Sequence, residues 1–431
     1  MRRFSILLFL LFITSTICLA DFSAKGGLNG NPYVIQPPSG TGLDKVFIFN
    51  GIQNSSLSFE VSNPSDWTWY IYENDQASAQ KVNVTDVVYT DVNVTLKNVQ
   101  SDHGYFVLSG SGLKKYVYVV GYEPIIFSSI VFLDEGNICD VVTLKISATS
   151  KPLGYYPVSS SIKRLLERQF KLLWNTLEWN ATSSAYDIKE MSSTSEDIDI
   201  NLSVISPLTD TYFTVSGDQY ASYFGIEQTI KSELFKAVAV KANASAVLQE
   251  RNADNETGKN NGDLSGSAPL NIQFFSNPSD AVNLVEWYIY KPNDESGAYT
   301  RFTDQDLNYS FKDFGTYKVK LFVSNTFCRD SAEFNPKVSD FFLECPNFFT
   351  PRSSPGENDE FRVAYRSVVS FKGVIVNRWG NVMFEWNDPA LGWDGNYKGK
   401  PVSPGVYFYV IEAKGSDGII YNKKGDINLL E

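Results

Sequence analysis

The sequence contains a single histidine, His103, and this limits the acid–base chemistry that its side chains can perform. Nucleophilic sites of the Ser-His and Cys-His types need an imidazole beside the nucleophile, so any such site would have to include His103. The sequence has no Gly-x-Ser-x-Gly elbow, and Ser101-Asp102-His103-Gly104 is typical of a turn. Gly-rich nucleotide-binding loops are also missing. We therefore predict no catalytic role for His103 and no cofactor.

Paired carboxylates remain the one catalytic device that the sequence leaves open, because their separation in space cannot be read from it. Glu196, Asp197 and Asp199 form a local acidic cluster. A solvated acidic loop is the default interpretation. A carbohydrate-acting enzyme with its site in residues 124–262 therefore stays an alternative function, and we predict that the chain is not an enzyme.

Four tryptophans are candidates for stacking on sugar rings, because a flat aromatic face matches the apolar C–H face of a sugar. Trp67 and Trp69 lie in one strand-like run, and we expect them to face opposite sides of it, with one exposed. Trp174 and Trp179 are the other candidates. Core packing is the default role of all four, and the surface ligand, protein or glycan, stays unidentified.

The first 20 residues have the pattern of a secretory signal peptide. Arg2 and Arg3 precede an apolar run from Phe4 to Ile13, and Ala20 ends a small-residue cleavage site. The run is too short to cross a bilayer, which takes about 20 apolar residues. Cys18 suggests lipoprotein processing as an alternative, but the residues before it do not match the usual lipobox. We expect no transmembrane span.

Charge and composition exclude one class of partner. The net charge is −12, and it is −14 without residues 1–20, which hold two Arg and no acid. Nucleic-acid binding needs a basic face, so we predict no nucleic-acid partner. Tyr, Phe, Val and Thr, which favour strands, are abundant, and long helical periodicity is nearly absent. The fold class is therefore predicted to be all-β.

Three cysteines follow the signal peptide, namely Cys139, Cys328 and Cys345. No Cys-x-x-Cys or Cys/His grouping is present, so we predict no metal site. An exported chain meets an oxidising compartment, in which disulfides form. Cys328 and Cys345 flank a predicted domain junction, and we predict that they pair and leave Cys139 free. Three buried thiols are the alternative.

An internal repeat indicates two related domains. Phe59 to Asp66 is followed by Trp69-Tyr70-Ile71-Tyr72, and Phe274 to Asp280 is followed by Trp287-Tyr288-Ile289-Tyr290. Each copy places an Asn-Pro-Ser-Asp turn between two strand-like runs. A strand led by Trp and packed across the core is typical of Ig-like sandwiches. The second copy continues with alternating residues and resembles a PKD domain.

The domain order follows from these patterns. Residues 124–262 are the least readable part, in which Ile162 to Leu173 is compatible with a short helix or with a loop that leads into a strand. Residues 250–267, rich in Asn, Asp, Gly and Ser, are predicted to be a linker or long loop. We predict a loose segment at 21–44, an Ig/PKD-like domain at 45–122, a β-rich Ig-like domain at 124–262, a PKD-like domain at 266–345 and a small sandwich at 346–431.

The last 86 residues carry strand and turn signals in a specific order. Phe371 to Val376 alternates as a strand, Asn377 to Asn381 forms a tight turn, and Val382 to Trp386 returns as its partner. A second turn, Gly392-Trp393-Asp394-Gly395, contains a large aromatic side chain that the domain has to bury. Trp379 and Trp393 are expected at the core or edge of this domain.

These motifs resemble the gliding-motility-associated C-terminal domain, the type B sorting domain of the Bacteroidota type IX secretion system. The resemblance implies an export address recognised by the type IX secretion translocon. The family's Phe-Thr-Pro-Asn-Gly-Asp-Gly run, whose oxygens could hold a hard cation, has lost its central Asp here, so we expect no metal. The residues that carry the motif are Asn358, Asp359, Asn377, Arg378, Trp379, Gly380, Gly392, Trp393, Asp394, Gly395, Gly405 and Tyr407.

The sequence therefore predicts tandem Ig/PKD-like β-sandwiches that end in a small sorting domain. The expected product is a non-enzymatic, adhesin-like cargo protein, secreted or held at the outer membrane of a Gram-negative bacterium. A fixed outer-membrane component of the secretion or motility machinery is a further alternative.

Overall fold

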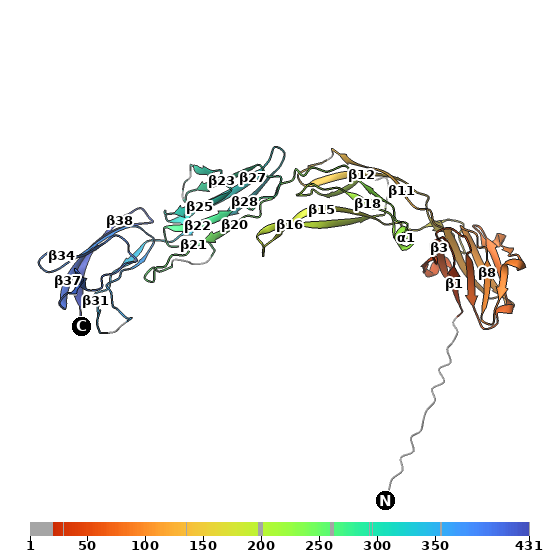
Figure 1. Ribbon diagram of the computed structural model, residues 1–431, viewed down its shortest axis with the longest axis horizontal. Coiled ribbons are helices and arrows are strands. Elements are labelled where there is room, and N and C mark those ends of the chain that lie inside the picture. The colour runs from red at the N-terminus through yellow and green to blue at the C-terminus, as the bar shows by residue number, and fades with distance from the viewer. Residues whose placement is uncertain are drawn as a thin grey trace, which may run out of the picture.

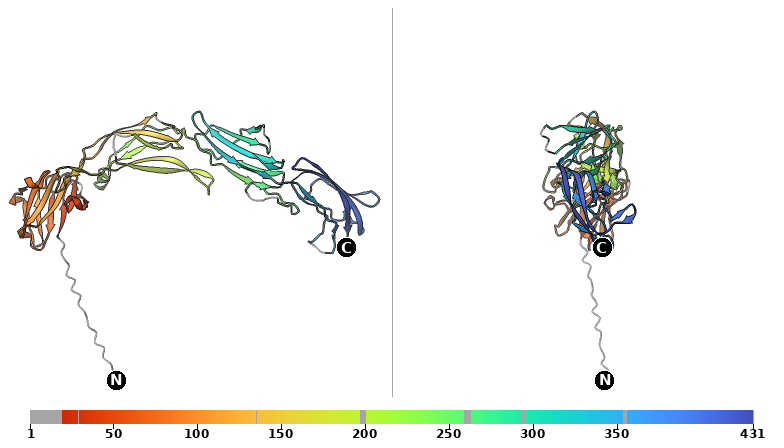
Figure 2. Two further views of the ribbon diagram at one scale, coloured as in Figure 1. Left: turned by 180° about the vertical axis from the view of Figure 1, so that it is seen from behind. Right: turned by 90° about the vertical axis from the view of Figure 1, so that its left-hand side faces the viewer.

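Strands with alternating apolar residues dominate the computed structural model, which describes residues 20–28, 30–134, 136–196, 201–258, 263–292, 294, 296–353 and 356–430. The predicted signal peptide falls outside these residues except for Ala20. The strands build four modules that follow one another in a curved row, from the orange module at the N-terminal end to the blue module at the C-terminal end (Figures 1 and 2).

The first module is a sandwich of two sheets around the buried Trp69. One sheet has the order β1 (Asp21–Lys25), β4 (Ser56–Glu60), β8 (Asn93–Lys97), β7 (Val87–Tyr89). The other has the order β2 (Tyr33–Ile35), β3 (Lys45–Phe49), β10 (Lys114–Gly121), β9 (His103–Ser109), β5 (Trp67–Tyr72), β6 (Gln80–Lys81). Four 3-10 turns lie at Ser39–Thr41, Pro64–Asp66, Gln76–Ser78 and Val84–Asp86.

The prediction of a loose segment at 21–44 was wrong. Strand β1 pairs with β4 and β2 pairs with β3, so this segment supplies a strand to each sheet. The physical reason is the buried Phe22, whose ring lies 4.7 Å from that of Phe59. Lys45 Nζ adds bonds to Asp21 Oδ2 and the Phe22 carbonyl, each 2.7 Å long. Burial of this side chain, together with pairing of the two strands, helps to offset the entropy lost on ordering the segment.

The second module has an outer sheet of three strands and an inner one of four. The three-stranded sheet has the order β11 (Ile126–Leu133), β12 (Val141–Thr149), β17 (Asn201–Ile205). The four-stranded sheet has the order β16 (Ala185–Ser195), β15 (Phe170–Asn180), β18 (Thr214–Ser216), β19 (Thr229–Lys231). A short ladder, β13 (Gly154–Tyr155) with β14 (Arg164–Leu165), and helix α1 (Gln219–Tyr223) complete it. Of the two interpretations of Ile162 to Leu173, the loop that leads into a strand is the one observed.

The third module repeats the plan of the first, as the internal repeat predicts. Trp69 on β5 and Trp287 on β23 are both fully buried, and in each copy the strand before the turn belongs to the opposite sheet. The sheets are β20 (Ser245–Leu248), β22 (Leu270–Phe275), β25 (Asp306–Phe311); β24 (Tyr299–Phe302), β23 (Leu284–Tyr290), β27 (Lys318–Ser324), β28 (Arg329–Phe334); and β21 (Ser265–Gly266), β29 (Lys337–Val338), β26 (Gly315–Thr316).

The fourth module packs one large sheet over a core that includes Trp393 and Trp386. The large sheet has the order β31 (Phe348–Phe349), β38 (Ile420–Leu429), β37 (Gly405–Gly415), β33 (Val368–Val376), β34 (Val382–Trp386). Two short ladders, β30 (Phe342–Glu344) with β32 (Ala364–Arg366) and β35 (Asn396–Tyr397) with β36 (Lys400–Pro401), lie against it.

The first and second modules share a buried junction. Val46 and Tyr118 of the first belong to one apolar cluster with Tyr155 and Tyr220 of the second. Beside this cluster, Arg168 Nε lies 2.5 Å from Asp218 Oδ2, and Tyr122 donates its hydroxyl to Asp218 Oδ1 at 2.8 Å. A cluster that includes both modules together with a buried ion pair indicates a rigid joint between them.

The second and third modules are joined by a disulfide that the sequence did not predict. Cys139 pairs with Cys328 with 5.5 Å between their Cα atoms, and Cys345 is free. The predicted Cys328–Cys345 pair was therefore wrong. Cys328 and Cys345 are near each other in sequence, but this did not predict the pairing. Cys328 lies just before β28, where the third module meets the second, and there it reaches Cys139. Tyr186 adds a hydrogen bond from its hydroxyl to the Asn277 carbonyl across this joint, at 3.2 Å.

Replacement of Cys139 by serine should lower the free energy of unfolding by about 2–4 kcal/mol, the usual contribution of a native disulfide. Urea titration with and without dithiothreitol measures this. Reductant should destabilise the native chain and a Cys345→Ala control alike, and should have no further effect on Cys139→Ser. Equal sensitivity of Cys139→Ser to reductant would contradict the assignment.

Candidate recognition site on the C-terminal module

The turn between β33 and β34 is held by the side chain of its first residue. Asn377 Oδ1 accepts hydrogen bonds from the backbone N–H groups of Trp379 and Asn381, both at 3.0 Å. The backbone of Asn377 also pairs with that of Asn381, and Gly380 takes a φ of 83°, which a side chain would strain. Asn, Gly and Asn therefore serve to fix the turn, whereas Arg378 and Trp379 are left to project from it.

Trp379 is 70% exposed, which is unusual for the largest apolar side chain. The Arg378 guanidinium lies 4.2 Å from the centre of its ring, a cation–π arrangement. We expected Trp379 at the core or edge. It lies outside the core, at the tip of the hairpin, with most of its surface in solvent.

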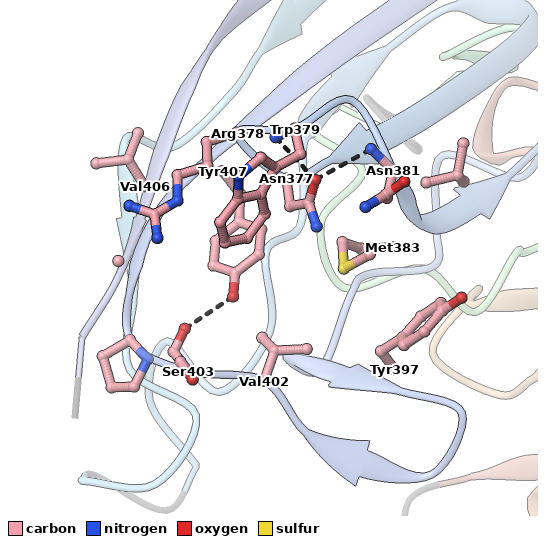
Figure 3. A pocket seen from close by; sticks show the side chains of 13 residues that line it. Asn377, Arg378, Trp379, Asn381, Met383, Tyr397, Val402, Ser403, Val406 and Tyr407 are labelled. Carbon is pink, nitrogen blue, oxygen red and sulfur yellow. Dashed lines mark hydrogen bonds between the residues drawn. The ribbon is translucent and has the colours of Figure 1, made fainter.

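An open groove of about 930 Å³ lies beside this hairpin tip. Figure 3 shows Arg378 and Trp379 on one side of the groove and Tyr397 and Val402 on the other. Tyr407 stands between them, with its hydroxyl bonded to the Ser403 carbonyl at 2.8 Å, and burial raises the pKa of that hydroxyl. The lining is Asn377, Arg378, Trp379, Asn381, Val382, Met383, Tyr397, Val402, Ser403, Pro404, Gly405, Val406 and Tyr407.

The groove suits a ligand that is both apolar and anionic. Arg378 contributes a cation, and the residues that line the groove include no Asp or Glu. Aromatic and aliphatic side chains supply the remaining contact surface. Such a combination, an aromatic–Arg pair on a half-apolar surface, is common at the centre of protein interfaces.

The second turn motif has a structural role. Trp393 is 0% exposed, and its Nε1 donates to the Asn396 carbonyl at 2.8 Å. A Cβ on Gly392 would lie 2.4 Å from the Arg362 side chain, and Gly395 has a φ of 74°. Asp394 accepts the Asn396 backbone N–H at 2.9 Å. These residues bury the tryptophan and keep its loop closed.

The Asn358-Asp359 motif also shapes a loop. The Asn358 carbonyl accepts the Thr350 N–H at 2.8 Å, and Asp359 Oδ2 accepts the Gly356 N–H at 2.6 Å. Among the residues that the structure describes, no three His, Cys, Asp or Glu side chains gather in a way that could hold a metal ion. Gly405, at φ 148°, begins β37 at the rim of the groove.

Three of the four tryptophans considered for stacking on sugars are not exposed to a ligand. Trp67, Trp69 and Trp174 are all buried in module cores. The expectation that Trp67 and Trp69 face opposite sides was wrong, because residues two apart on a strand share a face. Trp179 is half-buried, with its ring 5.1 Å from that of Tyr186.

Of the acid–base candidates, the structure describes His103 and Glu196. The His103 ring nitrogen Nδ1 lies 2.7 Å from the Ser101 carbonyl, at the start of β9. Glu196 is exposed, and Asp197 and Asp199 lie outside the described residues.

Sequence reasoning missed the apolar side chains that accompany the hairpin tip. Tyr397 lies in a short ladder with no strong pattern of its own, and Val402 directly follows that ladder. Val406, Phe408 and Val410 are all exposed on the outer face of β37. The sequence shows that these residues alternate with Tyr407 and Tyr409 along the strand. It does not show which of the two faces of the strand is buried.

Comparisons with known families now bear on two parts of the chain. Residues 343–429 match the CHU_C type IX secretion signal domain, and residues 131–232 match the fibronectin type III domain. The second match falls on the module that was hardest to interpret from sequence. A search of curated proteins returned no match.

Several solved structures are similar to the chain at low identity. Sidekick-1 immunoglobulin domains 1–5 share 10% identity over 84% of this chain and 74% of that one, with a TM-score of 0.23. Chicken CNTN1 FN1–FN3 domains share 12% over 72% and 100%, with a TM-score of 0.22. Dimeric latent PorU from Porphyromonas gingivalis shares 11% over 71% and 34%, with a TM-score of 0.16. TM-scores this low carry no argument about function.

Within the described part of the chain, no helix has the length and apolar character needed to cross a membrane. The C-terminal match agrees with the resemblance drawn from the turn motifs, and it implies export. The chain thus consists of tandem immunoglobulin- and fibronectin-like β-sandwich modules that end, at residues 343–429, in a type IX secretion signal domain.

Proposed function

We propose that this chain is a non-enzymatic, adhesin-like surface protein, and that its signal domain is read by the type IX translocon through the hairpin tip of Arg378 and Trp379. The observation that carries the second part is the 70% exposure of Trp379 on a turn that Asn377 holds in place. A tryptophan mostly in solvent adds little to the stability of its own module, and this one lines a groove beside an arginine, so contact with a partner accounts for it better.

The row of modules supports the adhesin-like part of the proposal. Joints formed by a shared core and by a disulfide would let the chain act as a stiff spacer between the signal domain and the first module. This support comes from the architecture alone, so the ligand is left open.

Carbohydrate binding is the second candidate. Of the four tryptophans considered for it, Trp179 is the one outside a module core, and its ring packs edge to face with that of Tyr186 near the end of the β15–β16 hairpin. The other alternative is a fixed outer-membrane component of the machinery. Such a component should co-purify stably with outer-membrane proteins. A released or surface-anchored cargo should not co-purify with the translocon at steady state.

Protease accessibility on intact cells tests the export role. Loss of residues 346–431 should leave the protein inside the outer membrane. Trp379→Ala should reduce the exported fraction at least about tenfold, because loss of an interface hot spot costs about 2 kcal/mol. Ile419→Ala is the matched control, since Ile419 is an exposed apolar residue on another turn of the same sheet.

The result is interpretable only if the variant is folded, so hydrogen exchange of the purified Trp379→Ala chain should match that of the parent. Export of folded Trp379→Ala at the parental level would rule out the hairpin tip. Export of the truncated chain at the parental level would rule out the whole signal assignment.

A further inference from the structure

A segment of the third module, between β20 and β21, is built into the fourth. Residues 251–257, here called the clasp, lie in the stretch predicted to be a linker, and that prediction was wrong for them. Glu256 forms a parallel bridge with Tyr365 at the centre of β32. On its other side, Tyr365 pairs with Leu343 of β30. Strand β32 of the signal domain therefore lies between two segments that come earlier in the chain.

The clasp is held by hydrogen bonds along its length. Thr257 donates its N–H to the Tyr365 carbonyl at 2.8 Å, and Tyr365 donates its N–H to the Asn255 carbonyl at 3.2 Å. Asn255 Nδ2 donates to the carbonyls of Val363 and Pro389, at 2.8 and 2.7 Å. One amide side chain thus bridges two separate loops of the signal domain.

The clasp also contributes to the core of the signal domain. Ala253 is buried in the same apolar cluster as Leu343, Phe361 and Trp393. The Glu256 side chain is fully buried and forms an ion pair with Arg251, which also donates to the Ser267 carbonyl at 3.1 Å. A buried carboxylate is costly unless it is paired, and Arg251 supplies that pairing from within the clasp.

Contacts beyond the clasp strengthen the same joint. Ser367 donates its N–H to Ser267 Oγ at 2.7 Å, and Ser367 Oγ accepts the Ala268 N–H at 3.0 Å. Both serines are fully buried. The rings of Phe341 and Tyr421 stack with 4.0 Å between their centres.

From these contacts we infer that the clasp holds the signal domain to its cargo without need of the covalent junction, so that a cut after β30 does not release the domain. Just beyond β30, Cys345 and Pro346 are half-buried and Asn347 and Phe348 are exposed. Both neighbours of β32 stay with the cargo after such a cut. The signal domain would then persist on the exported protein as a bound part of it.

A purified mature chain with a site-specific protease sequence inserted between Cys345 and Pro346 tests this. After complete cleavage, verified on a denaturing gel, the two pieces should co-elute in size exclusion at micromolar concentration. Ala253→Asp with Asn255→Ala should separate them and raise their dissociation constant on the order of 100-fold, because both core burial and two hydrogen bonds are lost. Asp254→Ala, at the exposed residue between them, should not.

Separation of the cut parental chain to the same extent as the double variant would overturn the inference. Hydrogen exchange of the uncut chains gives a second readout that needs no insertion. Exchange at the Tyr365 amide should accelerate at least about tenfold in Asn255→Ala and stay parental in Asp254→Ala, since a lost pair of hydrogen bonds favours local opening. No acceleration would also overturn it. Neither readout involves secretion, so this inference and the proposed function can fail separately.

Discussion

Replacement of Arg168 by alanine should lower the free energy of unfolding of the first two modules by about 3–5 kcal/mol, the cost of leaving a buried charge without its partner. The Asp218 side chain is 0% exposed, and Arg168 Nε is its cation. Arg168 also donates to the carbonyls of Lys151 and Glu123, at 3.1 and 2.9 Å. Its loss would leave these groups unpaired at the joint between modules. Urea titration with native-state hydrogen exchange measures the effect.

Lys151→Ala is the matched control at the same joint. Lys151 lies 3.0 Å from Glu123, but both side chains are about half exposed, so the pair should contribute less than about 1 kcal/mol. Addition of Asp218→Asn to Arg168→Ala should recover part of the loss. Asparagine removes the charge and still accepts from the Tyr122 hydroxyl and the Ala221 N–H, which bond Asp218 at 2.8 and 2.9 Å. An effect of Arg168→Ala no larger than that of Lys151→Ala would contradict a buried, specific ion pair.

Replacement of Trp393 by alanine should destabilise the signal domain by about 3–5 kcal/mol, as expected for a large aromatic side chain removed from a core. Its ring lies 5.1 Å from that of Tyr407 and 5.4 Å from that of Phe349. The Asn396 carbonyl would also lose its indole partner. Hydrogen exchange of peptides from β37 and β38 should accelerate accordingly, and export should fail because the recognition surface is no longer formed.

The contrast with Trp379 separates stability from recognition. Trp379→Ala should change the stability of the domain by no more than about 0.5 kcal/mol, because the side chain is mostly in solvent. Both variants should therefore lose export. Trp393→Ala should do so with a destabilised signal domain, and Trp379→Ala with a signal domain of parental stability. A parental exchange pattern in Trp393→Ala would be inconsistent with its place in the core.

Much of the signal domain could be predicted from sequence. The strand from Phe371 to Val376, the turn at Asn377 to Asn381 and the return strand depend on residues within a few positions of each other, so their pattern is local. The Trp-led strands of the repeat are local in the same way. The groove could not be predicted, because Tyr397 and Val402 reach Trp379 only through the folding of β35 and β36 against the large sheet.

The sequence by itself determined the all-β class, the paired modules and the export signal at the C-terminal end. These follow from alternation, turn residues and motif order, which act over short distances along the chain. Only the tertiary structure decided that Cys139 pairs with Cys328, that Trp379 is exposed while Trp174 is buried, and that residues 251–257 enter the signal domain. The disulfide and the position of residues 251–257 depend on which surfaces meet between modules, whereas the two tryptophans depend on which strand faces are buried within one module. The contacts between modules join residues about 100 or more positions apart, as in the pair Cys139 and Cys328. A periodic pattern of apolar residues does not reveal which distant residue a side chain will contact.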